Sequence, residues 1–433
     1  MSHEISELKD YPVRRLESAK GLLLAGGVLA VLGLIAFVLG LGADADQAWR
    51  AYIYNWIFFA GIAQGAVILA AVVTLTRGVW SRPIRRVSLS FVAFLPIAYL
   101  ILFPPVLIWG ADHILPWLSP EMDVGGKAAY LNLPFLAARN LLSLGVLLVV
   151  SLVFAYYALR PDAALAKEHG LGAFGRMTRG WRGQEAEEVR SHRMLSKLSP
   201  TIVLVYAVAW SFIAFDFVMS LDPHWLSTLI GPYVFMAAFL GGIAATAVMT
   251  LFYRRKLDLA DYIESANIHD LGKLMFAFCV FWAYLFWAQY LVIWYGNLPN
   301  EQVFFNNRLG DPYRPLSIAV FFMLFVLPFF GLLGVRPKKT PAILASFAGV
   351  ILLGLWLERY VLVYPTLYPG ADAIPFGIAE IGAALLMGGL LIAALGWFAS
   401  RFPILQVWQP ATEIELLGVH VPETTATRPA HGA

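Results

Sequence analysis

The stretch WSFIAFDFVMSLDP at residues 210–223 has the composition of the end of a hydrophobic helix, with one carboxylate, Asp216, set deep in it. A related stretch, LWLERYVLVYP at residues 355–365, carries Glu358. In both stretches a proline follows the acid seven residues later. A lone carboxylate in a lipid-spanning helix is costly and usually functional, so two in matching surroundings predict a duplicated membrane unit.

The composition predicts a multi-pass membrane protein. The chain of 433 residues is 60% hydrophobic and only 14% charged, whereas a soluble domain carries about 25% charged residues. Its single cysteine, Cys279, excludes an internal disulfide and a cysteine-held metal cluster. The basic residues fall in loops rather than among the aromatic residues, so the formal net charge of +3 does not indicate a nucleic-acid partner.

Ten apolar runs reach the length of roughly twenty residues that a transmembrane helix needs. The fold class expected is therefore an all-α integral membrane protein, with an uncleaved first helix. Two of the expected helices open with a proline, at Pro200 and at Pro341. The expected spans are residues 20–41, 49–76, 87–110, 132–158, 199–220, 230–253, 270–297, 316–335, 341–363 and 374–400.

The distribution of lysine and arginine predicts the orientation of these spans. One set of connections, together with both terminal tails, holds nearly all the basic residues, whereas the opposite set holds only Arg50, Lys127, Arg308 and Arg314. Because basic loops stay in the cytoplasm, both termini are expected there. The expected location is the cytoplasmic (inner) membrane of a cell, in contact with the lipid bilayer.

Three short matches suggest an internal repeat. GIAQGAV at 61–67 resembles GIAATAV at 242–248, AYL at 98–100 recurs at 283–285, and IW at 108–109 recurs at 293–294. Spans 2–5 and 6–9 would then be two four-helix bundles in the same orientation, with spans 1 and 10 flanking them. The small residues of the first match also have a simpler explanation, because they let helices pack closely.

The repeat predicts five segments along the chain. They are a cytoplasmic tail with the first helix at 1–48, a first bundle at 49–222, a second bundle at 223–366, a tenth helix at 367–400 and a cytoplasmic tail at 401–433. The charged connection 159–198 is expected to be a solvated link between the bundles, and a short surface helix around residues 185–193 is the alternative. The last dozen residues are expected to be disordered or bound to a partner.

Most of the charged residues expected inside the membrane fall in its periplasmic half. Asp216 lies sixteen residues after Pro200, roughly 24 Å along a helix, and Glu358 follows Pro341 at nearly the same depth. These acids are interpreted as proton carriers, or alternatively as ion-pair partners, Asp216 with Arg139 and Glu358 with nearby basic residues. The full set at this depth is Asp112, His113, Arg139, Asp216, Glu358, Arg359 and Glu380, with Arg359 as a counter-charge.

Two smaller groups have both a functional and a plain interpretation. Trp109, Asp112 and His113 end the third span and, with Arg139, form a candidate quinol contact; an interfacial aromatic and an interfacial histidine are the alternatives. At the opposite end, His269, Asp270 and Lys273 open the seventh span as a candidate proton-uptake point or as a helix cap.

Haem and metal ligation are not indicated. Axial ligation of a b-type haem needs histidines that face each other in mid-membrane, and no histidine falls in the middle of a span. No tetrahedral metal-binding pattern or glycine-rich phosphate loop is present either.

The chain resembles the polysulfide-reductase/NrfD-like family of quinone-interacting membrane subunits. Within it, the chain is most similar to the second such membrane subunit, the ActF type, of alternative complex III, a quinol:cytochrome c oxidoreductase. Four stretches carry the resemblance, which covers roughly residues 15–410: YIYNWIFFAGIAQG at 52–65, FPPVLIWGADH at 103–113, residues 210–223, and QYLVIWYGNLP at 289–299.

The resemblance implies two four-helix bundles and quinol oxidation near the periplasmic face. The implied partners are a paralogous NrfD-like membrane subunit, an iron–sulfur subunit, c-type haem subunits and small membrane subunits. Haem and iron–sulfur clusters would lie on those partners, with none bound by this chain and quinol as its one candidate ligand. His113 matches the histidine typical of the family's quinol sites, whereas span 4 carries Arg139 and lacks the acid found there.

Three functional hypotheses follow. The first is a cofactor-free subunit that scaffolds the membrane part of a respiratory quinol oxidoreductase and conducts protons through polar half-channels. The second is a subunit that binds quinol itself around Trp109, Asp112, His113 and Arg139. The third is a secondary transporter with parallel repeats, although no charged substrate cup is evident.

Overall fold

The computed structural model describes residues 11–163 and 177–408, and these residues fold into helices with no β-strand among them. Ten helical segments are long and apolar enough to cross a membrane. The protein is therefore an all-α, multi-pass membrane protein, as the sequence predicts. The distal C-terminal residues, for which disorder or a partner is expected, lie outside the described ranges.

Seven of the ten segments are single continuous helices, and the other three contain 3₁₀ or π turns. The continuous ones are α1 (Lys20–Ala43), α2 (Ala45–Leu75), α5 (Leu133–Leu159), α8 (Ile230–Lys256), α9 (Ser265–Gly296), α14 (Pro341–Leu367) and α15 (Ile378–Arg401). The third segment, Val79–Ile114, contains α3 (Arg82–Leu89) and α4 (Ala111–Ile114); the fifth, Gln184–Met219, contains α7 (Gln184–Ala214); the eighth, Arg314–Gly331, contains α11 (Arg314–Phe321) and α12 (Leu327–Gly331).

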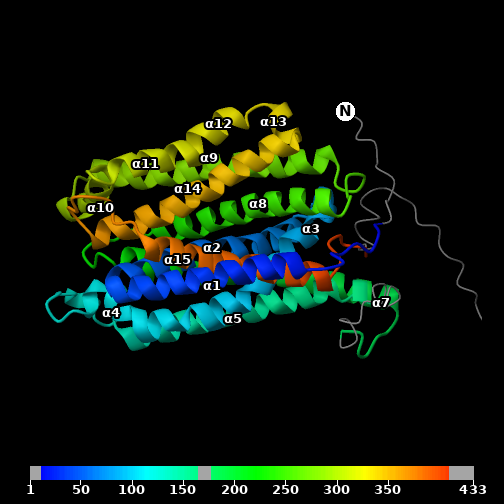
Figure 1. Ribbon diagram of the computed structural model, residues 1–433, viewed down its shortest axis with the longest axis horizontal. Coiled ribbons are helices and arrows are strands. Elements are labelled where there is room, and N and C mark those ends of the chain that lie inside the picture. The colour runs from blue at the N-terminus through cyan, green and yellow to red at the C-terminus, as the bar shows by residue number, and fades with distance from the viewer. Residues whose placement is uncertain (1–10, 164–176, 409–433) are drawn as a thin grey trace, which may run out of the picture.

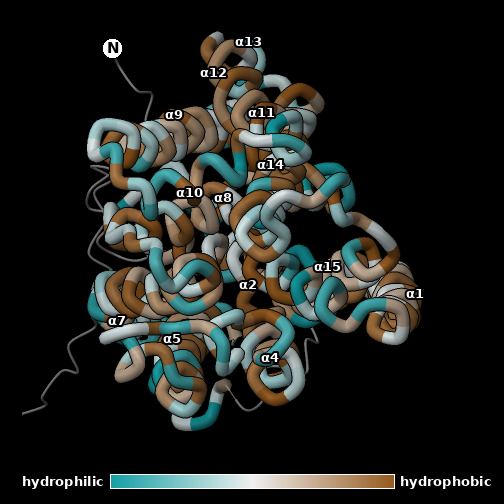
Figure 2. Tube along the Cα trace, turned by 90° about the vertical axis from the view of Figure 1, so that its left-hand side faces the viewer, coloured by the Kyte–Doolittle hydropathy of each residue, from teal (hydrophilic) through white to brown (hydrophobic). Residues whose placement is uncertain are grey.

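The long helices lie side by side along one axis, and the view along that axis separates them into groups (Figures 1 and 2). Helices α4, α5 and α7 lie on one side, and α9, α11 and α14 lie on the other. Helices α2 and α8 pack against each other between these groups, and α1 and α15 form a flanking pair. The short helices α10 (Pro299–Leu309) and α13 (Val335–Lys339) lie at opposite ends of the second group.

Glycines set the contact between α2 and α8. A β-carbon at Gly65 would overlap the backbone of Ala238, and one at Gly242 would overlap the backbone of Gly65 and Ala66. Both glycines belong to the two matching GIA stretches. The close-packing interpretation of those stretches is therefore confirmed, because only residues without a side chain allow the two backbones to approach this closely.

Glycines also set the contact between the flanking helices α1 and α15. Helix α1 carries glycines at 26, 33 and 40, and α15 carries them at 382, 389 and 396, each series with a spacing of seven. A β-carbon at Gly33 would overlap the backbone of Leu386, and one at Gly389 would overlap that of Ala30. Most of the remaining surface of α1 is exposed and apolar, as expected for a helix that faces lipid.

The fifth span begins earlier than the sequence predicts. Pro200 does not open it but lies inside α7, which starts at Gln184. The buried guanidinium of Arg160 forms an ion pair with Glu187, with its Nε 2.6 Å from Oε2, and ties the extra turns to the end of α5. The alternative of a helix around residues 185–193 is therefore the one observed, as the first turns of α7, because a tertiary ion pair and helix-favouring residues extend the helix.

Three spans contain π turns. They occupy Ile97–Leu102 and Val106–Gly110 in the third span, Phe215–Met219 in the fifth and Phe322–Val326 in the eighth. Single π turns in α-helices occur often at functional sites. The one in the fifth span holds Asp216, and the one in the eighth lines the cavity described below.

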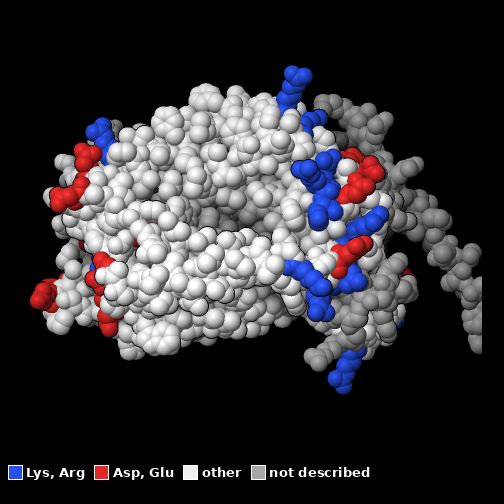
Figure 3. Space-filling model, in the orientation of Figure 1, with Lys and Arg blue, Asp and Glu red and all other residues white. Residues whose placement is uncertain are grey.

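Charged residues gather at the two ends of the molecule and leave an uncharged belt between them (Figure 3). Lysine and arginine dominate the visible part of the end where α3 and α13 lie, and acidic residues are more frequent at the end where α10 lies. Such a belt between charged ends is the surface that a bilayer requires, since charged side chains are costly in the hydrocarbon region.

Candidate functional site

Asp216 is fully buried and held by two neighbours on α5. The Arg139 guanidinium donates to both carboxylate oxygens, through Nε at 2.8 Å and Nη2 at 2.5 Å, and Asn140 Nδ2 donates at 2.5 Å. Arg139 also donates to the carbonyl of Tyr130 and lies over the Tyr130 ring, 3.8 Å from its centroid. The structure thus brings Arg139 and Asp216 together as the ion pair that the sequence offered as an alternative.

Glu358, the second buried acid that the sequence singled out, lies on α14 and has a different environment. Its Oε1 accepts a long hydrogen bond, 3.4 Å, from the indole nitrogen of Trp282, and its Oε2 has no hydrogen-bond partner. Arg359 Nη1 lies 3.3 Å from Oε2 but makes no hydrogen bond, while Nη2 of the same residue donates to the carbonyl of Val234. An unmatched buried carboxylate oxygen is costly, and this marks Glu358 as the less stabilised of the two acids.

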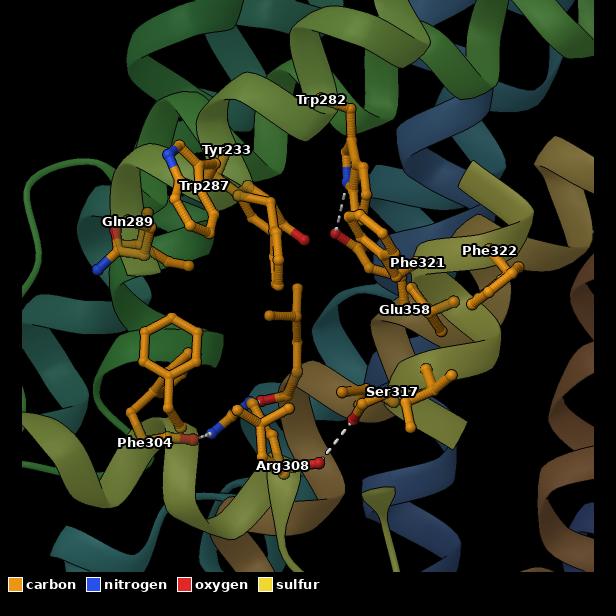
Figure 4. A pocket seen from close by; sticks show the side chains of 18 residues that line it. Tyr233, Trp282, Trp287, Gln289, Phe304, Arg308, Ser317, Phe321, Phe322 and Glu358 are labelled. Atoms are coloured by element: carbon orange, nitrogen blue, oxygen red, sulfur yellow. Dashed lines mark hydrogen bonds between the residues drawn. The ribbon is translucent and has the colours of Figure 1, made fainter. Parts of the chain in front are cut away.

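Glu358 lines a cavity of about 360 Å³ in the second group of helices (Figure 4). The walls are mostly aromatic and come from α8, α9, α10, α11, the π turn at Phe322–Val326, and α14. The hydroxyl of Tyr233 points toward the carboxylate of Glu358 (Figure 4). This volume lies within the range of roughly 300–1,000 Å³ that is typical of small-molecule sites.

A second charged residue, Arg308, lines the same cavity from α10. Its guanidinium donates to the carbonyls of Phe304 and Leu362 at 2.7 Å and to the hydroxyl of Thr366 at 2.9 Å. Its Nε has no partner, and it forms no ion pair with any described carboxylate. Burial lowers the pKa of Arg308 to about 9, which leaves the side chain cationic at neutral pH.

The four candidate quinol contacts are not joined to one another by side-chain hydrogen bonds or ion pairs among the described residues. Trp109 is 64% exposed, and Asp112 is exposed as well. His113 Nδ1 lies 2.6 Å from a carboxylate oxygen of Asp46. No hydrogen bond or ion pair joins Arg139 to Asp112 or His113 in the part of the chain that the structure describes, because Arg139 is directed to Asp216.

Glu380 stabilises the start of α15. Its carboxylate accepts hydrogen bonds from Gln47 Nε2 at 2.9 Å, from the backbone nitrogen of Gly377 at 2.7 Å and from the hydroxyl of Tyr364. These contacts cap α15 and join it to α2 and α14. Such a set of donors is typical of a structural carboxylate near a helix N-terminus.

The group at the start of α9 is partly exposed. Lys273 Nζ lies 2.5 Å from Asp270 Oδ1, with 56% of the lysine side chain and 24% of the aspartate side chain accessible. His269 is half-buried beside them. Further along the membrane interior, the hydroxyls of Thr246 and Thr250 on α8 are buried and have no hydrogen-bond partner.

Sequence reasoning missed the cavity and its basic residue. It counted Arg308 among loop arginines, although the residue is buried and faces Glu358 across the cavity. The available signal was FFNNR at 304–308, which places Phe304 and Arg308 four residues apart on one helix face after a helix-starting Pro299.

The chain was compared with protein-family models and with curated proteins, and neither comparison produced a match. Among the described residues there is no group of three or more histidine, cysteine, aspartate or glutamate side chains that could hold a metal ion.

Proposed function

We propose that the protein is an integral membrane subunit of a respiratory quinol:electron-acceptor oxidoreductase, similar to the ActF-type subunit of alternative complex III. It scaffolds the membrane arm and carries protons through Glu358. The proposal is supported by the ten-span fold, by the four stretches that resemble the NrfD-like family, and by the different environments of the two repeat-related acids.

The observation that carries the proposal is the unequal pairing of Asp216 and Glu358. The carboxylate oxygens of Asp216 accept hydrogen bonds from Arg139 and Asn140, so neither oxygen is left without a donor. Glu358 Oε2 accepts no hydrogen bond, although Arg359 Nη1 lies 3.3 Å away, and the residue borders a cavity, so its carboxyl group can exchange a proton with a bound molecule or water. A buried acid next to a space that a ligand can enter is suited to proton transfer.

Polar groups on α8 extend the proposed proton path from Glu358 toward the basic end of the molecule. The unpaired hydroxyls of Thr246 and Thr250 lie four residues apart on α8, the helix that also supplies Tyr233 to the cavity. In this proposal, a water chain along these hydroxyls forms a half-channel from the basic end, where Lys273 and Asp270 lie partly exposed.

In this proposal the subunit works in the inner membrane within a complex, with a paralogous NrfD-like subunit, an iron–sulfur subunit, c-type haem subunits and small membrane subunits. The electron carriers lie on those partners. The exposed apolar face of α1 and the lipid-facing sides of α9 and α11 supply surface for contact with membrane partners or lipid.

Glu358→Gln in the assembled complex tests the proposal. We expect normal assembly, because glutamine keeps the hydrogen bond from Trp282, together with a lower ratio of protons released to electrons transferred. Glu121→Gln changes an exposed loop acid and is the matched control. An unchanged ratio in the Glu358 variant, measured by proton release during quinol-driven acceptor reduction, would remove Glu358 from the proton path.

A further inference from the structure

The cavity beside Glu358 opens to the lipid-facing surface between α9 and the eighth span. Trp287, Ile318 and Phe322 line it and are 56%, 46% and 49% exposed, respectively. Glu358 and Arg308 line the same cavity but are buried. The cavity is therefore bordered by exposed apolar side chains on one side, and two buried charged residues face each other across it (Figure 4).

The two charged residues present complementary hydrogen-bonding atoms. Glu358 Oε2 is a buried acceptor that makes no hydrogen bond, although Arg359 Nη1 lies 3.3 Å away, and Arg308 Nε is a buried donor that makes no hydrogen bond. Buried polar atoms are paired in the great majority of cases, so two unpaired ones around one cavity indicate a missing molecule that supplies both a hydroxyl donor and an oxygen acceptor.

The walls favour a flat ring. Trp282 stacks on Phe286 with an interplanar angle of 9°, and both line the cavity. Phe304 stacks on Trp225 with ring centroids 3.9 Å apart, and the guanidinium carbon of Arg308 lies 3.4 Å from the centroid of the Phe304 ring. Rigid aromatic faces of this kind provide offset-stacked or edge-to-face contacts for a planar ligand ring.

We propose that this cavity binds the ring of a prenylated quinol that enters from the bilayer. One ring hydroxyl donates to Glu358, an oxygen on the opposite side of the ring accepts from Arg308, and the prenyl tail leaves past Ile318 into the lipid. The assignment rests on the proposed function of the chain as a subunit of a quinol oxidoreductase. It places the ring in the second bundle, away from Trp109, Asp112 and His113.

Other membrane molecules fit the cavity less well. An acyl chain fills the apolar walls but leaves Glu358 Oε2 and Arg308 Nε unpaired. An anionic lipid headgroup pairs with Arg308 but brings a negative charge toward Glu358. A neutral ring with one donor and one acceptor oxygen satisfies both residues.

Photolabelling of the assembled complex tests this site directly. A photoreactive azidoquinone is added to the complex in lipid nanodiscs, and the labelled peptides are identified by mass spectrometry. We expect label on peptides of α9, α10 or α14 that line the cavity. A short-chain quinol and a prenylated quinol should both compete, whereas excess phospholipid should not.

Two variants give the matched comparison. Ile318→Trp fills the mouth, and Leu353→Trp adds the same bulk to an exposed position of α14 that does not line the cavity. Ile318→Trp should reduce the cavity label about tenfold or more, a change equivalent to a tenfold weaker dissociation constant, and Leu353→Trp should leave it unchanged. Glu358→Gln and Arg308→Gln should each weaken binding while the complex remains assembled.

Three results would overturn the site. In the first, the label is found only on segments that do not line the cavity. In the second, Ile318→Trp does not reduce labelling of the cavity. In the third, phospholipid reduces labelling of the cavity but short-chain quinol does not. The proposed function is judged separately, by whether the wild-type complex reduces its acceptor when supplied with quinol. If the complex reduces its acceptor with quinol but the cavity is not labelled, the proposed function stands and the proposed quinol site is wrong.

Discussion

Arg139 and Asp216 form a bidentate ion pair that joins α5 to the π turn at the end of the fifth span, with nitrogen–oxygen distances of 2.8 and 2.5 Å. Both side chains are buried, and Asn140 completes the pairing. Because a guanidinium and a carboxylate fit each other in this geometry, the pair fixes the relative rotation of the two segments.

Breaking this pair should destabilise the protein. Arg139→Ala leaves Asp216 as an uncompensated buried charge, and Asp216→Ala does the same to Arg139; each is expected to cost about 3–5 kcal/mol. The double variant Arg139→Met, Asp216→Leu should cost clearly less than the sum of the two single losses. The measurement is thermal unfolding of the purified protein in detergent.

The exposed pair of Asp46 and His113 is the control for that experiment. Asp46 is 53% exposed and His113 is 34% exposed at the side chain, so Asp46→Asn should change stability by less than about 1 kcal/mol. Equal losses for the buried and the exposed pair would show that Arg139 and Asp216 do not hold the segments together.

Glu380 should behave as a structural acid. Glu380→Ala leaves the donors of Gln47, Tyr364 and Gly377 without their acceptor, and buried donors left unpaired cost about 1–3 kcal/mol each. We expect lower thermal stability, with the proton-to-electron ratio of the surviving complex unchanged. A change in that ratio at normal stability would instead place Glu380 in the proton path.

The close glycine contacts between α1 and α15 predict that the effect of a leucine substitution on stability depends strongly on its position in α1. Gly33→Leu places a side chain where the backbone of Leu386 lies and should separate the two helices, with a loss of about 1–3 kcal/mol or more. Gly27→Leu, six residues earlier on α1, meets nothing within 4 Å and should be tolerated. Thermal unfolding and the yield of folded protein distinguish the two variants.

The buried hydroxyl of Thr246 allows stability and proton transfer to be separated. Thr246→Val keeps the shape and removes an unpaired hydroxyl, so it should leave stability equal or raise it by about 1 kcal/mol. The same change should slow proton uptake if a water chain passes this position. Stopped-flow measurement of pH changes would contradict the path if the rate stayed at the wild-type value.

Cysteine labelling can test the expected orientation of the spans in the membrane, because the only cysteine of the sequence, Cys279, is buried. Glu121→Cys and Lys256→Cys place thiols at exposed positions on opposite ends of the spans. A membrane-impermeant maleimide applied to intact cells, with the outer membrane opened where one is present, should label position 121. Position 256 should react only after the inner membrane is made permeable, and the reverse pattern would invert the topology.

The spans and the location of the two acids were predictable from the sequence. Apolar runs of transmembrane length predicted all ten segments, with most boundaries close to those observed, because length and hydropathy are local properties. The start of the fifth span was not predictable in this way. It depends on the pairing of Glu187 with Arg160, a contact between segments that hydropathy does not encode.

The sequence by itself determined that the chain is a bundle of membrane helices, that its charges lie mainly at the ends, and that Asp216 and Glu358 are acids within spans; the structure shows both buried. The tertiary structure decided that Asp216 is paired and that Glu358 borders an aromatic cavity with Arg308. Pairing depends on how helices rotate and cross, and this is set by contacts such as Gly65 against α8 between residues far apart in the chain.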